Sequence, residues 1–294
     1  MNHDSDAFQA SPRRLPVVVL GIAYRSNSDA LSLARQIMGN NEARGKPYLV
    51  LVDNSEGSDL ASALAKTERE QCDLIVHVPG SNLGYFGGAA SGLDVFLSNY
   101  KLPDWVIVCN VDLCLEGRDF FSRLIYYGGS HSHAVIAPGI ISNLSGSDQN
   151  PFMRSRPSNL RMNSYKALFK WYPLLCIYSA MHLAKQRLLK LKASSGVCPA
   201  NPNTKPVPIY AAHGACIAFR KSYFEAGGTL QHGAFLFGEE IFVAETVRRL
   251  GLSIAYDPRL RVFHEDHKTT GHRPTRLVAS YMKQAAAYCS DMFF

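Results

Sequence analysis

The sequence predicts an α/β fold with a mostly parallel β-sheet that is flanked by helices. Short β-rich runs alternate with helical patterns between residues 17 and 109, and polar residues follow these runs. The chain has 294 residues, of which 47% are hydrophobic, so it can bury a full core. In open α/β sheets ligands bind beyond the carboxyl ends of the strands. The polar residues that follow the runs are therefore the first candidates for a site.

Four strands and three helices are expected in the first half of the chain. The expected strands are Val17–Tyr24, Tyr48–Val52, Leu74–Val78 and Trp105–Cys109. The expected helices end at about Met38 and span Leu60–Glu70 and Ala89–Leu97. The polar cluster Ser26–Asp29 is expected to cap the first of these helices.

The second half departs from this alternation after the apolar run Val135–Pro138. Residues 143–208 contain a Ser-, Asn- and Pro-rich loop and an amphipathic stretch, which indicates a helical insertion. Regular structure is expected to resume with Ile209–Phe219, a helix near Glu239–Leu250, strands near Ser253–Tyr256 and Arg261–Phe263, and a C-terminal helix from about Thr275. We expect a single domain over residues 1–294, with halves at 16–142 and 209–294 on either side of the insertion.

Charge and composition narrow the location and the partners. A net charge of +7 favours an anionic partner, but the basic residues form no nucleic-acid recognition motif, so nucleic acid is not expected. Seven cysteines without a C-x-x-C pair indicate buried thiols in a reducing compartment. The polar start, Met1–Arg14, does not resemble a secretion signal, and Trp171–Ala184 is shorter than the roughly 20 residues of a spanning helix. A cytoplasmic location is expected.

Asp53-Asn54-Ser55 directly follows the second expected strand. The Asp53 carboxylate would project into the ligand crevice, where it can accept hydrogen bonds from a base or a ribose. The alternative is a local Asx-turn, because this sequence is common turn chemistry.

A glycine-rich segment from Asn82 to Gly92 predicts a loop-to-helix junction that a phosphate can approach closely. It is not G-x-G-x-x-G, and the first strand offers only Gly21, so a dinucleotide site is disfavoured. The first strand is also followed by no glycine-rich basic loop, which argues against a sugar nucleotidyltransferase.

Asn110-Val111-Asp112 closes the fourth expected strand. Alternation along an extended chain would place the Asn110 and Asp112 oxygens on one side. Such ligands suit Mg²⁺ or Mn²⁺, and a divalent ion can neutralise a departing diphosphate. The alternative is again a turn.

The second half contributes acids, histidines and small residues. Glu239 and Glu240 begin a helical segment, as solvated N-terminal charges or as a pair that includes a general base. His264 is a candidate metal ligand, and His267 would orient substrate, although a surface position explains either histidine. The small residues Gly214-Ala215 would let an acceptor sugar lie close to the backbone, or would serve strand packing alone.

In this order the motifs resemble those of the family 2 glycosyltransferases of the GT-A fold, in a rhamnosyltransferase-like branch. The resemblance covers about residues 16–142 and 208–275 and is carried by Val52–Ser55, Asn82-x-Gly84, Asn110–Asp112, His213–Cys216, Glu239–Glu240 and His264. It implies a Rossmann-like GT-A sheet and an inverting transfer of a sugar, rhamnose being one candidate. The donor would be a nucleotide diphosphate sugar, and the acceptor a glycan or a lipid-linked sugar of a surface polysaccharide such as O-antigen.

The resemblance also implies roles for individual residues. The nucleotide-sugar ligands would be Tyr24, Asp53, Asn82, Gly84, Asn110 and Asp112. Asp112 and His264 would bind Mg²⁺ or Mn²⁺, and Glu240 would deprotonate the acceptor. The acceptor would contact Gly214, Ala215, Glu239 and His267. The chain departs from the usual family pattern in having Asn110 in place of an aspartate and a Glu-Glu pair in place of Glu-Asp.

Residues 165–192 interleave apolar and aromatic residues with Lys and Arg, a pattern that suits an interfacial helix. A helical hairpin packed on the core explains the same pattern. The interfacial alternative would place the protein on the inner face of the plasma membrane, near a polyprenyl-diphosphate-linked acceptor in the cytoplasmic leaflet. A non-catalytic sugar-binding module on the same fold, and a homo-oligomer, are left open.

Overall fold

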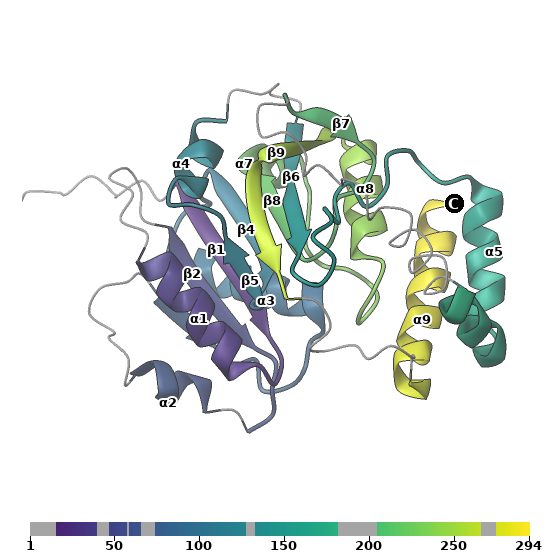
Figure 1. Cartoon of the computed structure of the whole chain (residues 1–294), viewed down its shortest axis with the longest axis horizontal. Helices are drawn as coiled ribbons and strands as arrows, with labels where there is room; N and C mark the ends of the chain where they lie inside the picture. Colours follow the sequence, from purple (N-terminus) through teal and green to yellow (C-terminus); the bar gives the residue numbers. More distant parts are fainter. Residues whose placement is uncertain are drawn as a thin grey trace, which may run out of the picture.

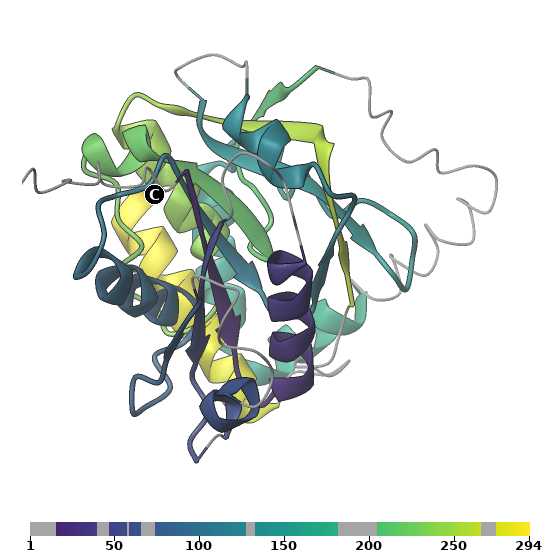
Figure 2. The ribbon, with the colours of Figure 1, turned by 90° about the vertical axis from the view of Figure 1, so that its left-hand side faces the viewer.

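The protein was analysed as a computed structural model, which describes residues 16–39, 47–57, 59–65, 74–127, 133–181, 205–265 and 275–294. The strands of the described part form one nine-stranded sheet. Along its main path the order is β3-β2-β1-β4-β8-β6-β9-β5, and β7 pairs with β9. Figures 1 and 2 show this sheet with helices on both of its faces.

The first half of the sheet is parallel. It contains β1 (Val17–Ala23), β2 (Tyr48–Asp53), β3 (Leu74–His77) and β4 (Trp105–Asn110). Every residue of β1 and β2 is buried, as expected for parallel strands covered on both faces. Their carboxyl ends lie at one edge of the sheet because the strands run in the same direction.

The second half of the sheet is mixed. Its strands are β5 (Leu113–Leu115), β6 (His133–Ser142), β7 (Val207–Ile209), β8 (Cys216–Arg220) and β9 (Ser253–His264). Strand β8 is antiparallel to both β4 and β6, whereas β6 and β9 are parallel to each other. The short strands β5 and β7 are both antiparallel to β9.

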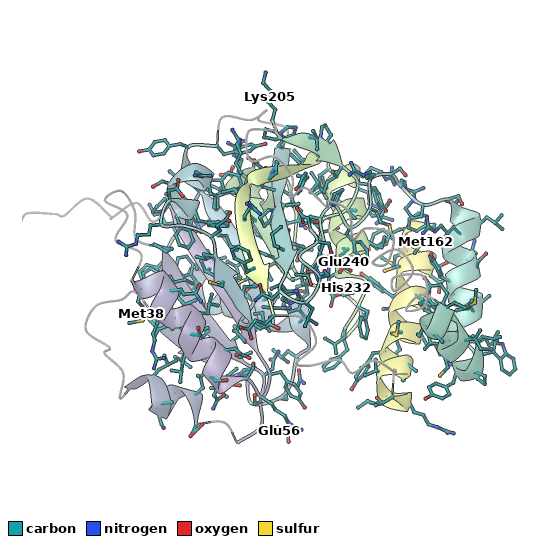
Figure 3. The ribbon with its side chains drawn as sticks, viewed as in Figure 1. Met38, Glu56, Met162, Lys205, His232 and Glu240 are labelled. Carbon is teal, nitrogen blue, oxygen red and sulfur yellow. The ribbon has the colours of Figure 1, made fainter. Side chains whose placement is uncertain are left out.

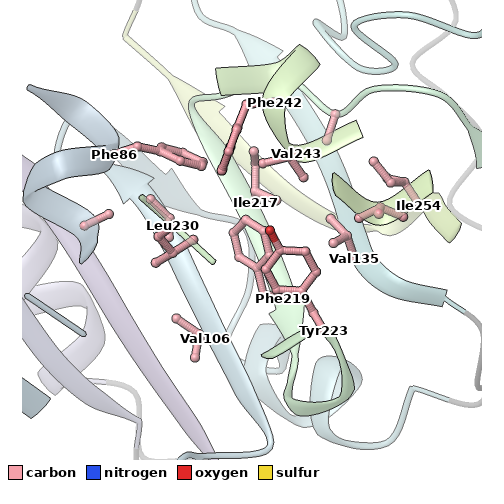
Figure 4. Packing of buried hydrophobic residues seen from close by; sticks show 14 of the residues in the cluster. Phe86, Val106, Val135, Ile217, Phe219, Tyr223, Leu230, Phe242, Val243 and Ile254 are labelled. Atoms are coloured by element: carbon pink, nitrogen blue, oxygen red, sulfur yellow. The ribbon is translucent and has the colours of Figure 1, made fainter. Parts of the chain in front are cut away.

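Two hydrophobic cores fill the spaces between the sheet and its helices. One contains Phe86 of α3 (Tyr85–Leu97), Phe242 of α8 (Glu239–Arg249) and Phe293 of α9 (Arg276–Phe293). Figure 4 shows Phe86 and Phe242 in this cluster. The other lies under α1 (Asn27–Met38), α2 (Leu60–Ala65) and α4 (Phe120–Ile125). Helix α7 (Lys221–Glu225) follows β8.

The insertion contributes helix α5 (Asn159–Phe169) and a second helical stretch over residues 172–181. Helix α5 packs beside α9 at one end of the molecule (Figure 1). Ser290 Oγ and Asn163 Oδ1, 2.8 Å apart, join the two helices. No helix in the described residues is both long enough and apolar enough to cross a membrane.

The expected elements of the first half are confirmed apart from their ends. Helix α3 begins at Tyr85 rather than Ala89, because the glycine-rich segment enters the helix instead of preceding it. Ser26 occupies the N-cap of α1 but its side chain makes no capping hydrogen bond. Residues 66–70 of the second expected helix lie outside the described residues.

The structure corrects three expectations. The apolar run expected over residues 209–219 contains the end of β7 and the start of β8, which are separated by a turn. The two strands expected over 253–263 are one strand, β9, whose pairing with β6 shifts register after Pro138. Residues 111 and 112 bend between β4 and β5 and do not continue the strand, so strand alternation does not apply to Asp112.

The cysteines divide by burial. Cys109, Cys216 and Cys289 are buried free thiols, as expected, but Cys114 is exposed because it lies on the short strand β5. Cys72 and Cys198 lie outside the described residues.

Candidate active site

The carboxyl ends of β2 and β4 flank the end of β1. Asp53 is paired in register with Ala23, and Asn110 with Ile22. Tyr24 follows β1 directly, and its ring is 38% exposed with the Arg25 guanidinium 5.2 Å from the ring centroid. The topology therefore brings three of the sequence-predicted donor residues to one edge of the sheet.

One oxygen of the Asp53 carboxylate forms the expected turn, and the other makes no hydrogen bond within the described residues. Ser55 N donates to Asp53 Oδ1 at 3.0 Å, which is an Asx-type turn. Asp53 is 1% exposed, and within the described residues its Oδ2 has no hydrogen-bond partner. A buried carboxylate oxygen without a partner is costly, so a ligand donor at this position would be stabilising. The turn and the binding alternatives are therefore compatible with each other.

The glycine-rich segment is held against β2. Asn54 Nδ2 donates to Gly84 O at 2.8 Å, and Gly84 N donates to Asn82 Oδ1 at 2.9 Å. A Cβ on Gly88 would lie 2.9 Å from Asn54 Nδ2, and one on Gly92 would lie 2.6 Å from Val52 Cγ2. These glycines allow α3 to approach β2 closely, with its N-terminus at the same edge as Asp53.

Asp112 and His264 form a carboxylate–imidazole pair beside this edge. Their Oδ1 and Nε2 atoms are 3.5 Å apart, and each side chain is 11% exposed. Gln149 Oε1 lies 3.0 Å from His264 Nδ1 and fixes the ring so that Nε2 faces Asp112. Glu265 N donates to Asp112 O at 3.1 Å, so the two chain segments are joined through the backbone as well.

The pair fits a divalent cation. Asp112 Oδ1 is buried and has no hydrogen-bond partner in the described part of the chain. A carboxylate oxygen beside an imidazole nitrogen is a donor set that Mn²⁺ accepts, and the Gln149 contact is the usual outer support of a metal-binding histidine. The described residues contain no group of three or more His, Cys, Asp or Glu side chains arranged for a metal. The protein would therefore supply two ligands, and a substrate or water the rest.

The acidic pair lies at the start of α8, after the left-handed residue Gly238. Glu239 is 6% exposed and accepts from Phe237 N at 3.0 Å, whereas Glu240 is partly exposed and accepts from Gly214 N at 3.3 Å. Burial, and then the neighbouring Glu240, raises the pKa of Glu239 to about 8. Burial also raises the pKa of Glu240. Near neutral pH the pair therefore resists carrying two charges.

Gly214 and Ala215 connect the acids to the edge of the sheet where β1, β2 and β4 end. A Cβ on Gly214 would lie 3.0 Å from Glu240 Oε1, so the carboxylate rests against the glycine backbone. Ala215 is 3% exposed, and its carbonyl accepts from Asn110 N at 3.0 Å. The segment between β7 and β8 thereby spans from the end of β4 to the acidic pair.

The sequence of the chain is similar to that of a known glycosyltransferase. No family model matches the chain. Over 280 residues the chain is 24% identical to N-acetylglucosaminyl-diphospho-decaprenol L-rhamnosyltransferase of Mycobacterium tuberculosis, in each of two strains. The match covers 93% of this chain and 84% of the relative.

Three solved glycosyltransferase structures share the fold. GalNAc-T7 with UDP, GalNAc and Mn²⁺ has a TM-score of 0.56 at 15% identity, covering 87% of this chain but only 44% of that one. The mannosyltransferase PcManGT from Pyrobaculum calidifontis, with GDP-Man and Mn²⁺, has a TM-score of 0.50 at 15% identity, covering 96% and 72%. S. aureus TarS has a TM-score of 0.51 at 12% identity, covering 85% and 60%.

The chain has the GT-A fold of these glycosyltransferases, and its sequence is similar to that of a rhamnosyltransferase. The fold and the resemblance predicted from the sequence are thereby confirmed. The roles of individual residues stay predictions, because the comparisons do not test them.

The geometry of the site adds residues that the sequence did not indicate. Gln149 reaches His264 across 115 residues of sequence, through the parallel pairing of β6 with β9. Tyr85 and His232 contact the backbone on either side of the acidic pair. Gln149 and His232 belong to no local motif, and Tyr85 lies in the glycine-rich segment without a signal of its own, so only the topology reveals these contacts. His267, the remaining expected acceptor ligand, lies outside the described residues.

Proposed function

We propose that the chain is a metal-dependent, inverting glycosyltransferase that moves a sugar from a nucleotide diphosphate donor to an acceptor hydroxyl. The observation that carries the proposal is the buried, unpartnered Oδ1 of Asp112, 3.5 Å from His264 Nε2. Asn110 and Asp53 are the other residues proposed to bind the nucleotide sugar at this edge. A bound Mg²⁺ or Mn²⁺ would neutralise charge on the departing diphosphate.

The nucleotide would bind at the ends of β1 and β2. Asp53 Oδ2 is an acceptor that a base N–H or a ribose O–H would satisfy, and the exposed ring of Tyr24 offers a surface for the base. Asn82 and Gly84, at the N-terminus of α3, would lie beside the diphosphate, where helix dipoles favour negative charge.

Glu240 would act as the general base. It would take the proton from the acceptor hydroxyl as that oxygen forms the new bond to the anomeric carbon. The bond from this carbon to the diphosphate breaks on the opposite face, and its electron pair leaves with the diphosphate. Attack from the face opposite the leaving group inverts the anomeric configuration. Glu239, Gly214, Ala215 and His267 are the proposed acceptor contacts.

The substrate class is proposed from the M. tuberculosis relative, whose name gives a rhamnosyl transfer to a lipid-diphosphate-linked N-acetylglucosamine. We propose rhamnose as the sugar and a polyprenyl-diphosphate-linked glycan as the acceptor, in the synthesis of a surface polysaccharide such as O-antigen. In this proposal residues 16–142 bind the donor, residues 209–294 bind the acceptor, and all belong to one domain.

The proposed location is the cytoplasmic side of the membrane, with peripheral contact through the insertion. Trp171, Leu174, Ile177 and Met181 are 46% to 67% exposed. The exposed cation Lys170 directly precedes Trp171, and the guanidinium of the exposed Arg276 lies 5.8 Å from the centroid of the Tyr172 ring. Apolar side chains bordered by cations suit an anionic lipid surface. The remainder of the amphipathic stretch, residues 182–192, lies outside the described residues.

The test is nucleotide release with defined variants. Purified protein is incubated with a panel of nucleotide sugars and a lipid-diphosphate acceptor, with Mn²⁺ or with a chelator. Asp112→Ala is expected to lose the Mn²⁺-dependent thermal shift with nucleoside diphosphate as well as turnover, because a ligand stabilises only the state that binds it. Glu240→Gln is expected to keep the shift and lose about 100-fold or more in kcat. Full turnover in both variants would refute the proposal.

A second candidate is a non-catalytic nucleotide-sugar-binding module. The substitution of Asn110 for the more common aspartate favours it, because an amide is a weaker cation ligand than a carboxylate. This candidate predicts a thermal shift that depends on the nucleotide sugar, and no release of nucleoside diphosphate with any acceptor.

A further inference from the structure

The backbones of two residues, Gly214 and Phe237, hold the acidic pair through their N–H groups, and an aromatic side chain contacts the carbonyl of each. Gly214 N donates to Glu240 Oε1, and the Gly214 carbonyl accepts from Tyr85 Oη at 2.7 Å. Phe237 N donates to Glu239 Oε1, and the Phe237 carbonyl lies 2.9 Å from His232 Nε2. A carbonyl oxygen only accepts, so His232 Nε2 carries a proton.

We infer that Tyr85 and His232 are positioning residues for the acidic pair, each fixing the backbone residue whose N–H holds one carboxylate. The inference rests on the proposed role of Glu240 as the base. Neither side chain needs to touch substrate for this role.

The backbone before α8 requires such support. Phe237 has φ 71° and Gly238 has φ 82°, both in the left-handed region. For a phenylalanine this conformation is unfavourable and persists only when its surroundings fix it. A Cβ on Gly238 would lie 2.8 Å from Cys289 Sγ and 3.7 Å from His232 Nε2, so both side chains line the turn. Figure 3 labels His232 and Glu240 in this region.

The surroundings of His232 favour a single neutral form. Its ring lies edge-on to Phe86 and Tyr288 and tilted against Phe242, with centroids 5.0 to 6.4 Å away. Its Nδ1 is buried and has no hydrogen-bond partner in the described residues. Burial lowers the pKa of the ring, so the ring is neutral at neutral pH, and its one proton is the Nε2–H that faces the Phe237 carbonyl.

Tyr85 links the glycine-rich segment to the backbone that holds Glu240. It is the first residue of α3 and follows Gly84, whose backbone approaches Phe235 so closely that a Cβ would lie 1.9 Å from the Phe235 carbonyl. Burial raises the pKa of Tyr85 well above its ordinary value, so the hydroxyl remains a donor. One residue therefore connects the N-terminus of α3 with the Gly214 peptide.

The first test is Tyr85→Phe, which removes one hydroxyl. We expect about a 10-fold fall in kcat with an unchanged Kd for the nucleoside diphosphate and Mn²⁺, because one hydrogen bond is lost away from the donor. The matched control is Tyr127→Phe, which removes a buried hydroxyl that lies 3.0 Å from His133 Nδ1 and away from the acidic pair. It is expected to keep kcat.

A pH profile separates positioning from general destabilisation. The Gly214 hydrogen bond lowers the pKa of Glu240, so loosening it in Tyr85→Phe should move the acid limb of kcat/KM for the acceptor to higher pH. The other titratable groups that interact with Glu240 are Glu239, Tyr85 and Cys289. Burial raises the pKa of all three. A structural defect alone would leave the limb in place.

His232 provides the second variant. His232→Gln retains an N–H at about the reach of Nε2 and is expected to keep most of kcat, whereas His232→Leu removes the donor and is expected to lose about 10-fold or more. Rescue by glutamine supports the inference. Equal losses in both variants, with both still giving the donor-dependent thermal shift, would overturn the role of His232.

A double-mutant cycle distinguishes this inference from the proposed function. In a Glu240→Gln background, Tyr85→Phe should cost nothing further, because its effect acts through the carboxylate. Full turnover in Glu240→Gln would remove the proposed base and with it this inference. A large loss in Glu240→Gln, with additive or wild-type behaviour of Tyr85→Phe, would overturn only the positioning role.

Discussion

The Glu239 carboxyl combines burial with a charged neighbour. It lies 6% exposed beside Glu240 and receives a hydrogen bond from Phe237 N. Two carboxylates in such a site do not ionise independently, so the more buried one keeps its proton to higher pH. The more exposed Glu240 is then the better placed to take a proton from a substrate.

This difference predicts a pH dependence of stability. The pKa of Glu239 is raised to about 8 in the folded protein, so between about pH 4.5 and 8 the folded state keeps a proton that the unfolded state releases. The free energy of unfolding should therefore fall as pH rises through this window. In Glu239→Gln, which resembles the protonated acid, the fall should be smaller. Urea unfolding at pH 5, 6.5 and 8 measures it.

The control for this prediction is Glu225→Gln, whose side chain is 57% exposed at the end of α7. It should show the pH slope of the wild type. A Glu239→Gln slope equal to that of the wild type would mean that the folded protein does not hold the extra proton.

Some site residues were predictable at this scale and others were not. Asp53, Asp112 and His264 each end or follow a strand, and strand order alone brings them to one edge of the sheet. Gln149 and Tyr85 have no such signal, because their partners lie 115 and 129 residues away in the sequence. Contacts of this kind depend on the path of the chain and not on a local pattern.

At the scale of elements, the start of α3 at Gly84 and Tyr85 determines how the edge of the sheet meets the loop before α8. Gly84 has φ +76°, and the space beside its Cα is occupied by the Phe235 carbonyl. The sequence predicted a junction here but placed the helix start four residues late, because glycines are poor helix formers. Packing against β2 outweighs that preference, since Gly88 and Gly92 allow the close contact.

A pair of glycines tests the packing at this junction. Gly84→Ala and Gly80→Ala both force an alanine into the left-handed region, at φ +76° and +80°, which costs about 1 to 2 kcal/mol. Nothing lies within 4 Å of a Cβ on Gly80, whereas one on Gly84 would meet a backbone oxygen at 1.9 Å. We expect Gly84→Ala to lower the free energy of unfolding by about 3 kcal/mol more than Gly80→Ala. Equal losses in urea unfolding would contradict the contact.

The mixed half of the sheet was the least predictable part of the fold. The sequence predicts two strands in place of β9, and Asp257 and Pro258 interrupt the apolar pattern between them. The chain accommodates them with a register shift against β6, and Asp257 forms an ion pair with Arg259 at 2.7 Å. The antiparallel insertion of β8 between β4 and β6 likewise depends on tertiary pairing.

At the scale of the whole molecule, the helices of the insertion lie at the opposite end from α1 and α2 (Figure 1). Packing on α9 and contact with lipid are not exclusive alternatives for them. Leu175 is fully buried and Tyr178 packs on Tyr165 and Phe169, so one face of residues 172–181 is occupied. The opposite side chains, which include Ile177 and Met181, are exposed.

This arrangement predicts that the protein binds anionic vesicles through the exposed face. Ile177→Glu with Met181→Glu removes two side chains that are 56% and 67% exposed and adds two negative charges. Because each buried apolar side chain contributes about 1.5 to 3 kcal/mol, co-sedimentation with phosphatidylglycerol vesicles should fall by at least 10-fold. Binding should also weaken in high salt and on neutral phosphatidylcholine, as screening and the loss of anionic lipid both reduce attraction to cations.

The matched control is Tyr126→Glu, which changes an aromatic side chain that is 62% exposed just after α4, and Figure 1 shows α4 well away from α5. It should bind vesicles like the wild type. Light scattering without lipid tests the alternative that a second copy of the chain, rather than lipid, covers this exposed face. A wild-type dimer that becomes monomeric in the double variant, without vesicle binding by either, would replace the lipid surface with a homodimer interface. Because the variants lie outside the proposed active site, turnover of a short soluble acceptor should be unchanged. A loss of turnover confined to the membrane-embedded acceptor would mean that this face brings the protein to its acceptor.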